Sequence, residues 1–233
     1  MGRPPRAAAG GLIYHALNRA NARRTIFEDR GDYGAFLGVL AEALAGHPTR
    51  LLADCIMPTH FHLVLWPRAD GELSDFMRWL TLTHTQRWHA HLRSAGTGHL
   101  YQGRFKAFPV EGDEHFLTVC RYVERNALRA GLVARAEDWP WGSLHQWCGE
   151  GSRRSPAEAV PSLSAWPMRR PPKWVERVNA ALSAEEEAAV RRSMERSQPF
   201  GRSAWQSATA ARLGLESTLR PRGRPRKERD NGP

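Results

Sequence analysis

The fold is decided by the stretch Leu51-Leu-Ala-Asp-Cys-Ile-Met-Pro-Thr-His60-Phe-His-Leu-Val-Leu-Trp66. It contains two short apolar runs, 51 to 56 and 61 to 66, of the length and composition typical of strands. The residues between the runs are few enough for a hairpin connection. We therefore predict two neighbouring antiparallel strands here.

The segments on both sides extend this hairpin to an α+β fold. In chain order, the predicted elements around it are a strand at 11–17, a helix at 32–44, a long helix at 73–92, a strand at 104–110 and a helix at 113–129. Asp113 is placed to cap the last helix, and Gly131 is placed to end it. The first six elements match a ferredoxin-like arrangement, an antiparallel sheet with helices on one face.

The composition indicates a polyanionic partner. The 233 residues carry a formal net charge of +10, with a pI near 10.5, and arginine provides most of the excess. Arginine binds phosphate in a bidentate manner and stacks on bases, which suits nucleic acid better than a membrane surface. The three cysteines are far apart and form no CxxC pair, so neither a disulfide framework nor a zinc ribbon is indicated. With no signal peptide and no long apolar run, we expect a cytoplasmic protein.

A His-x-His pair, His60 and His62, begins the second strand of the hairpin. Alternate side chains of a strand share a face, so both imidazoles point the same way while Phe61 points away. Two adjacent imidazoles can chelate one cation. They can also be two partly exposed strand histidines, because so short a motif often occurs by chance. A second pair, His89 and His91, lies in a predicted helix, where positions two apart do not face each other.

Tyr122 and Asn126 lie four apart in the last predicted helix, one above the other. A tyrosine in this place can be an ordinary residue at the edge of the core. Combined with His60 and His62, however, the Asn126 oxygen gives a mixed N/O ligand set that suits Mg²⁺ or Mn²⁺. A metal held there would polarise a phosphate. Tyr122 would then attack phosphorus and form a covalent phosphotyrosine.

Segments spread over nearly the whole chain resemble those of a known family. They are Tyr14-His-Ala-Leu-Asn-Arg19, Ile26-Phe-Glu28, Met57-Pro-Thr-His-Phe-His-Leu63, Gly103-Arg-Phe-Lys106, Arg121-Tyr-Val-Glu-Arg-Asn126, Arg129-Ala-Gly-Leu-Val133, Trp139-Pro-Trp141 and Leu213-Gly-Leu-Glu-Ser-Thr-Leu-Arg-Pro-Arg-Gly-Arg-Pro-Arg-Lys227. The family is that of the REP-associated tyrosine transposases, relatives of the single-strand insertion-sequence transposases within the HUH endonuclease superfamily. One departure is Ala127, where many relatives have proline; alanine continues a helix better.

The resemblance implies a function and a set of roles. His60 and His62 would be the HUH pair, Tyr122 the single nucleophile, and Asn126 the residue that completes the metal site. The substrate would be a single-stranded DNA hairpin from a repetitive extragenic palindrome. It would be nicked beside a short guide sequence and rejoined through a 5′-phosphotyrosine.

The expected DNA contacts fall in three places. The basic loop after the first strand provides Asn18, Arg19, Arg23 and Arg24, which by resemblance would meet the guide nucleotides. Arg104 and Lys106 alternate on a strand and could hold phosphates near the cut. The tail resembles an AT-hook and provides Arg222, Arg224 and Arg226. The loop can also be a solvated surface loop, and the tail only an electrostatic aid.

The composition changes after Trp147, which suggests a division of the chain. We expect a catalytic HUH transposase domain at 1–148, a Pro/Ser/Arg-rich linker at 149–182 and a helical C-terminal region with a disordered basic tail at 183–233. Two short helices are expected in the last region, at 183–196 and 203–213. We expect a monomer or a homodimer.

Two other functions stay open at this point. One is a DNA-binding protein that recognises hairpins without cutting them. The other is a metal-dependent nuclease that uses water, in which case Tyr122 is structural and no protein–DNA adduct forms.

Overall fold

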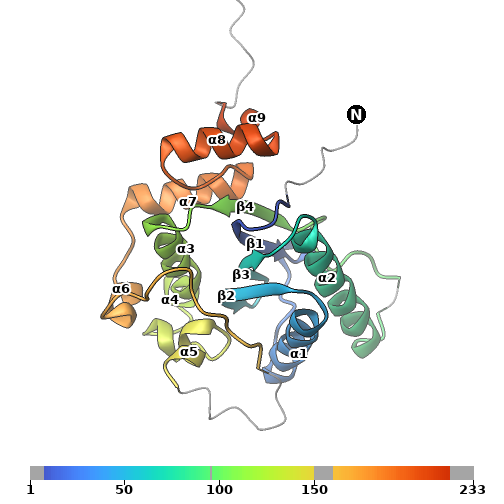
Figure 1. The fold of residues 1–233 in the computed structure, drawn as a ribbon. Helices are drawn as coiled ribbons and strands as arrows, with labels where there is room; N and C mark the ends of the chain where they lie inside the picture. Colours follow the sequence, from blue (N-terminus) through green and yellow to red (C-terminus); the bar gives the residue numbers. More distant parts are fainter. Residues whose placement is uncertain (1–7, 95, 150–159, 221–233) are drawn as a thin grey trace, which may run out of the picture.

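A four-stranded antiparallel sheet lies at the centre of the computed structural model, which describes residues 8–94, 96–149 and 160–220 (Figure 1). Its strands are β1 (Ile13–Arg19), β2 (Thr49–Met57), β3 (His60–Pro67) and β4 (Lys106–Val110). They are arranged in the order β2–β3–β1–β4, and each neighbouring pair is antiparallel. This is the ferredoxin-like order, so the fold class predicted from the sequence is confirmed.

The hairpin of β2 and β3 is tight, as predicted. Met57 pairs with His60, so only Pro58 and Thr59 lie between the strands. The turn is held from outside, because the Pro58 carbonyl accepts hydrogen bonds from the backbone N–H groups of Ile26 and Phe27. His60 is therefore the first residue of β3, and it directly follows a turn that the hydrogen bonds from Ile26 and Phe27 hold in place.

Helices α1 (Arg30–Gly46) and α2 (Glu72–His91) cover one face of the sheet, as the sequence predicted (Figure 1). Their core includes Phe36 and Phe76 packed with Phe61 of β3. Because side chains alternate along a strand, the next residue, His62, lies on the opposite face.

That opposite face is also covered, which the expected one-sided arrangement did not include. Helix α3 (Glu114–Glu124) packs across β2, β3 and β4, while α4 (Asn126–Arg129) and α5 (Ser143–Trp147) contact β2. Helix α7 (Ala184–Arg196) contacts β4 and α3, and α6 (Trp174–Asn179) packs on α3. The short 3-10 helices are η1 (Asn21–Arg23) and η2 (Ala136–Asp138).

The helix predicted at 113–129 is divided in the structure. Asp113 caps α3 by accepting the His115 N–H, as expected, and Gly131 takes a left-handed φ of 70° after α4. Arg125 separates α3 from α4, although its own N–H still bonds the Arg121 carbonyl and its carbonyl accepts the Arg129 N–H. Tyr122 therefore lies in α3 and Asn126 in α4, with the break at Arg125 between them, rather than within one regular helix.

Residues 160–182, most of the predicted linker, pack onto the sheet layer. The Trp174 side chain is 1% exposed, and its Nε1 donates to Glu124 Oε2 at 2.7 Å. Trp166 Nε1 donates to the Leu52 carbonyl at 2.8 Å, and the Arg170 guanidinium lies 3.8 Å from the Trp166 ring centroid. The division into domain, linker and C-terminal region stays a prediction, but this part of the chain shares the core of α3.

Both outer strands of the sheet are bonded by later segments. On β2, the Ile56 N–H donates to the Trp141 carbonyl at 2.8 Å, and the Leu51 carbonyl accepts the Ser164 N–H at 2.7 Å. Beside β4, the Phe200 N–H donates to the Pro109 carbonyl at 2.9 Å. The sheet edges are thus occupied at these positions.

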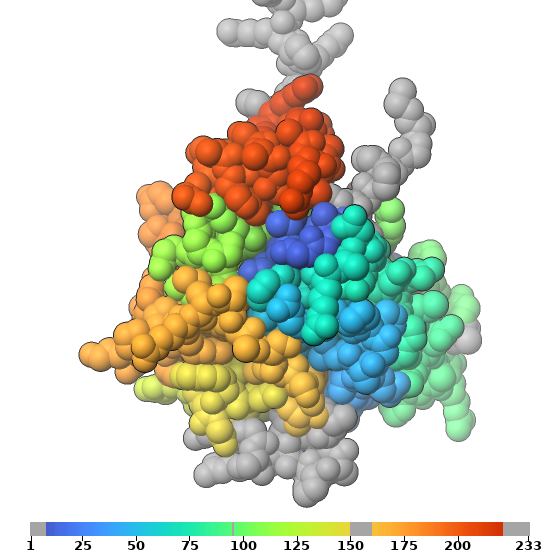
Figure 2. Space-filling view, viewed as in Figure 1, coloured from blue at the N-terminus to red at the C-terminus, as the bar shows by residue number. Residues whose placement is uncertain are grey.

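The two predicted C-terminal helices are confirmed as α7 and α8 (Ser203–Leu213), followed by α9 (Glu216–Leu219). Ser183 and Glu186 form a capping box at the start of α7. Figure 2 shows the last helices, in red, seated on the end of the molecule above the green and blue segments. The tail arginines Arg222, Arg224 and Arg226 lie outside the described residues. No helix within the described ranges is long and apolar enough to span a bilayer.

Replacing Trp174 by alanine should lower the free energy of unfolding by about 3 to 5 kcal/mol, because it empties a fully buried site and leaves Glu124 Oε2 without its donor. Urea denaturation of the full chain measures this. The matched control is Trp147→Ala at a side chain that is 48% exposed, with an expected change of about 1 kcal/mol or less. An equal, small effect in both variants would mean that residues 160–182 behave as a linker.

Candidate active site

His60 and His62 lie at the start of β3 with their rings 4.9 Å apart between centroids. His62 is buried and His60 is partly exposed. Their common face is the one covered by α3, while Phe61 points into the core under α1, as the alternation predicted. Thr59 Oγ1 is hydrogen-bonded to His60 Nδ1 at 3.0 Å and fixes that ring.

A third histidine, His15 of β1, lies against His62. The two rings stack with centroids 5.0 Å apart and planes 9° apart, and His15 Nε2 is 2.9 Å from His62 Nδ1. His15 is fully buried. His15 was not predicted as a site residue, because nothing local to residues 13–19 shows that β1 pairs with β3. That pairing sets His15 opposite Val64, on the same face as His62.

These imidazoles are neutral at pH 7. Burial lowers the pKa of His15 to about 3, and burial, with the charges of Arg19 and Arg129, lowers the pKa of His60 to about 3. The pKa of His62 is also held well below its usual value, mainly by burial. A neutral imidazole is the form that binds metal. Since His62 Nδ1 is engaged by His15, Nε2 is the nitrogen left for a cation.

Tyr122 of α3 lies against these histidines, and Asn126 begins α4 one helical turn later. The Tyr122 ring lies 6.1 Å from the His62 ring and 6.5 Å from the His15 ring, and it is 4% exposed. Asn126 is 1% exposed, and its buried Nδ2 has no hydrogen-bond partner among the residues that the structure describes. The tyrosine thus lies beside the histidine pair. The amide is a buried polar group whose oxygen, with two neutral imidazoles, makes a donor set that fits Mg²⁺ or Mn²⁺.

Arg129 joins these residues and was not singled out from the sequence. Its Nη2 donates to Asn126 Oδ1 at 3.1 Å, and its guanidinium carbon lies 4.8 Å from the Tyr122 ring centroid. Nη1 donates to Glu187 Oε1 of α7 at 3.0 Å. In the sequence, Arg129 could be recognised only by its position. It lies about two helical turns after Tyr122 and opens the segment Arg129-Ala-Gly-Leu-Val133, which resembles the family.

A pocket of about 390 Å³ opens onto Tyr122. Its rim is strongly basic, and its lining residues are Leu17, Asn18, Arg19, Gln102, Arg104, Lys106, Tyr122, Arg129, Arg191, Met194 and Glu195. Five of these carry a positive charge and one a negative charge, so the pocket favours an anion such as phosphate. Helix α7 provides the wall opposite the strands.

Of the six residues expected to bind DNA that the structure describes, four lie at this pocket: Asn18, Arg19, Arg104 and Lys106. Asn18 and Arg19 are not in a loop as predicted, because β1 continues through both and pairs them with Phe61 and His60. Arg104 precedes β4 rather than lying on it, yet it and Lys106 line the pocket together.

Arg23 and Arg24 lie apart from the pocket lining. Arg23 is exposed in η1, and Arg24 stacks on Trp88 with its guanidinium carbon 4.7 Å from the ring centroid. A larger groove, of about 1010 Å³, runs between α2 and residues 96–105 and shares Asn18 and Arg104 with the pocket.

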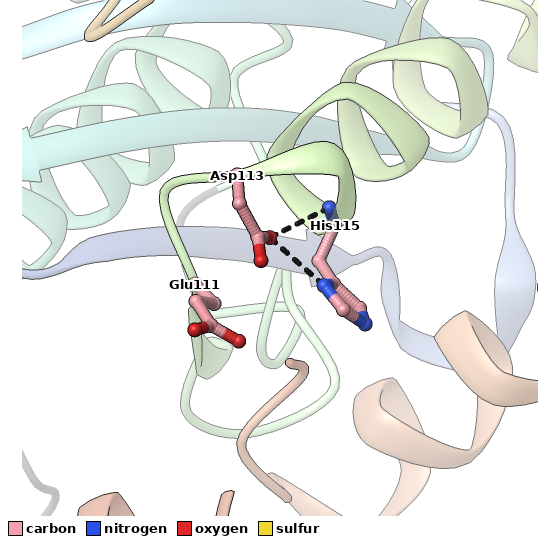
Figure 3. Close-up of side chains that lie close together, drawn as sticks. All are labelled: Glu111, Asp113 and His115. Carbon is pink, nitrogen blue, oxygen red and sulfur yellow. Dashed lines mark hydrogen bonds and ion pairs between the residues drawn. The ribbon is translucent and has the colours of Figure 1, made fainter. Parts of the chain in front are cut away.

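A second cluster of possible metal ligands consists of Glu111, Asp113 and His115 (Figure 3). Asp113 Oδ1 accepts the His115 N–H at 2.9 Å and lies 2.8 Å from its Nδ1. Glu111 Oε2 accepts the Arg202 N–H at 2.7 Å, and its Oε1 accepts the Arg202 Nε–H at 2.9 Å. The oxygens are therefore used to hold the start of α8, and this cluster is a structural clamp in its present arrangement.

Comparison with known proteins decides the family. A family model described as "Transposase IS200 like" matches residues 8–126, more than half of the chain. The chain belongs to the IS200-like transposase family. The matched segment of the transposase contains His60, His62 and Tyr122 and ends on Asn126. The family is one of enzymes, so the predicted enzyme class is confirmed.

Named relatives of this transposase agree with the resemblance drawn from its sequence. A REP-associated tyrosine transposase of Escherichia coli (strain K12) is 22% identical over 142 residues, which cover 61% of this chain and 81% of the relative. A putative REP-associated tyrosine transposase of Haemophilus influenzae is 21% identical over 145 residues, covering 59% and 81%. A solved structure, that of the REP-associated tyrosine transposase bound to a REP hairpin, matches 72% of this chain and 96% of its own, with a TM-score of 0.53 and 17% identity. At that identity the match shows a shared fold.

Replacing His15 by phenylalanine should weaken Mn²⁺ binding to the transposase by about 10- to 100-fold, because the stacked ring stays but the partner that orients His62 is lost. Calorimetric titration of the DNA-free protein measures the affinity. His84→Phe is the control, since His84 is buried on the other face of the sheet and bonds Tyr101. An unchanged Mn²⁺ affinity in His15→Phe would show that His15 only fills space.

Proposed function

We propose that this transposase is a metal-dependent single-stranded DNA transesterase. It nicks and rejoins DNA at repetitive palindromic hairpins through a covalent 5′-phosphotyrosine on Tyr122. The metal ligands are His60, His62 and the side-chain oxygen of Asn126.

One observation carries the proposal: Tyr122 lies beside the histidine pair, at a basic pocket. The His62 ring is 6.1 Å from the Tyr122 ring, and Arg129 touches both Tyr122 and Asn126. Arg19, Arg104 and Lys106 line the same pocket as the tyrosine. The proposal is supported by the closeness of Tyr122 of α3 to His62 of β3 and by the basic residues that line the pocket with Tyr122.

The chemistry of the residues supports a transesterification. Tyr122 Oη forms a bond to phosphorus while the bond from phosphorus to the 3′ oxygen breaks. The phenol proton goes to solvent, and the 3′ oxygen takes up a proton and leaves as a hydroxyl group. Because the phosphotyrosine is itself a phosphodiester, a 3′ hydroxyl can reverse the step and rejoin strands. A divalent ion held by His60, His62 and Asn126 would supply Lewis-acid polarisation of the phosphate.

The DNA is proposed to lie across the end of β1 and the start of β4. Asn18 can read a base edge, while Arg19, Arg104 and Lys106 position the phosphates. A hairpin is proposed as the substrate because the related structure is described as bound to a REP hairpin. Exposed Arg23 is suited to a more distant backbone contact, whereas Arg24 is partly engaged by Trp88.

The test is adduct formation on a denaturing gel. The protein is incubated with Mn²⁺ or Mg²⁺ and end-labelled single-stranded hairpins from repeats of its own genome. We expect a labelled band at protein mass that is lost in Tyr122→Phe and on addition of a chelator, because both remove a reacting component. Tyr101→Phe, at a buried tyrosine outside the reaction, is the control.

Other outcomes of this experiment have distinct meanings. Cleavage without an adduct would show a nuclease that uses water. Binding without either product, across metals and repeats, would show a protein that only recognises hairpins.

Neutralising Arg104 and Lys106 to glutamine should weaken hairpin binding at every sequence and flatten its salt dependence. Each lost phosphate contact lowers the log–log slope by about 1. Fluorescence anisotropy over a range of salt concentrations measures the slope. Arg78→Gln together with Arg87→Gln removes the same charge from exposed ion pairs on α2 and should leave the slope nearly unchanged. Identical slopes for both double variants would remove Arg104 and Lys106 from the DNA-binding surface.

A further inference from the structure

Arg129 is held at the centre of the proposed active site by two contacts. Its Nη2 donates to Asn126 Oδ1 at 3.1 Å, and its Nη1 donates to Glu187 Oε1 at 3.0 Å. Between these contacts the guanidinium lies over the Tyr122 ring, 4.8 Å from its centroid. The side chain is 28% exposed and lines the pocket, so it is reachable by a bound molecule.

The hydrogen-bonding capacity of Arg129 is not exhausted by these partners. A guanidinium has five N–H donors, and within the described ranges two of them are used by Asn126 and Glu187. The remaining three fit the bidentate geometry in which arginine binds phosphate. The other cations of the pocket, such as Lys106 and Arg104, are exposed at its rim, whereas Arg129 contacts the tyrosine itself.

We propose that Arg129 is a further catalytic residue, which binds a non-bridging oxygen of the scissile phosphate while Tyr122 attacks, and that Glu187 is its positioning residue. The inference rests on the transesterase function proposed above. Negative charge accumulates on the non-bridging phosphoryl oxygens and on the leaving 3′ oxygen in such a step. A preorganised cation bound to a phosphoryl oxygen stabilises that charge more in the transition state than in the ground state.

Glu187 acts through Arg129 and comes from a part of the chain beyond the family match. It lies on α7, where its Oε1 also accepts from Arg191 at 2.6 Å. A carboxylate that binds two arginines fixes the guanidinium plane of Arg129 towards the pocket. Helix α7 therefore contributes to the site by orienting Arg129, although it provides no reacting group.

The experiment combines Arg129→Gln with a DNA change at the scissile phosphate. One hairpin has the natural phosphodiester, and the other has a methylphosphonate, which removes the charged oxygen. We expect Arg129→Gln to slow adduct formation by about 100-fold on the natural DNA. On the methylphosphonate DNA, the loss should be about 2-fold or less, because the partner of the guanidinium is absent.

Several controls separate this outcome from simpler effects. Arg135→Gln removes the same charge at an exposed ion pair outside the pocket lining and should not change the rate. Arg129→Lys keeps the positive charge but not the bidentate guanidinium, so its rate of adduct formation should fall less than that of Arg129→Gln. This variant keeps the proposal testable if the glutamine variant folds poorly. If neither the unchanged protein nor Arg129→Gln cuts the methylphosphonate DNA, binding affinities for the two DNAs are measured instead in the Tyr122→Phe background. We again expect Arg129→Gln to weaken binding of the natural DNA but not of the methylphosphonate DNA.

The contradicting results are distinct. An equal loss on both DNAs, or no loss on the natural DNA, would overturn the catalytic role of Arg129. Absence of an adduct from the unchanged protein would instead count against the proposed transesterase function.

Glu187 is tested by a double-mutant cycle. Glu187→Ala should slow adduct formation by about 10-fold, while Glu187→Gln, which keeps an acceptor oxygen, should retain most of the rate. Combined with Arg129→Gln, Glu187→Ala should add nothing, because it acts through the same guanidinium. Additive losses would show that Glu187 is structural. Glu185→Ala, on the exposed side of α7, is the matched control.

Discussion

The antiparallel register between β1 and β3 is the constraint on which the site depends. It places Arg19 opposite His60 and Leu17 opposite His62, and it brings His15 diagonally against His62. Because side chains alternate along a strand, a slip of one residue would turn His60 and His62 into the core under α1 and α2. The Ala20 N–H, directly after β1, donates to the Thr59 carbonyl at 2.9 Å, and this bond ties β1 to the β2–β3 turn and opposes that slip. The hairpin therefore determines the face on which chemistry can occur.

The site combines neutral and charged groups in a consistent way. Burial keeps the three imidazoles uncharged, and the arginines around them provide the positive potential that a phosphate requires. Arg19 and Arg129 serve both purposes, since their charges also disfavour protonation of His60. A cluster of cations without a bound anion is costly, and Glu187 offsets part of this cost at Arg129. The packing of α7 is in this way connected to the electrostatics of the pocket.

Much of this could be predicted from the sequence because its signals are local. The alternation around His60 and the four-residue spacing of Tyr122 and Asn126 are readable from a few residues. His15 and Glu187 could not be found in this way, because each is defined by a partner 47 or 58 positions away in the chain. The packing of Trp174 was also missed, since a Ser- and Pro-rich composition obscures a single buried side chain. The point at which a strand ends, such as the end of β1 beyond Asn18, depends on pairing with the neighbouring strand. The intrinsic β-propensity of the residues does not specify that pairing.

The occupied edges of the sheet have a consequence for how the molecule can associate. Along β2, the backbone groups of Leu51, Leu52 and Ile56 bond to Trp139, Trp141, Ser164 and Trp166, and Pro109 of β4 bonds to Phe200. An open edge of so apolar a sheet would invite strand addition from another chain and aggregation. These bonds form only after the later segments have folded back. A nascent chain that has been synthesised only as far as Tyr122 lacks these later segments, so both outer strands of its sheet are still open to pairing with another chain.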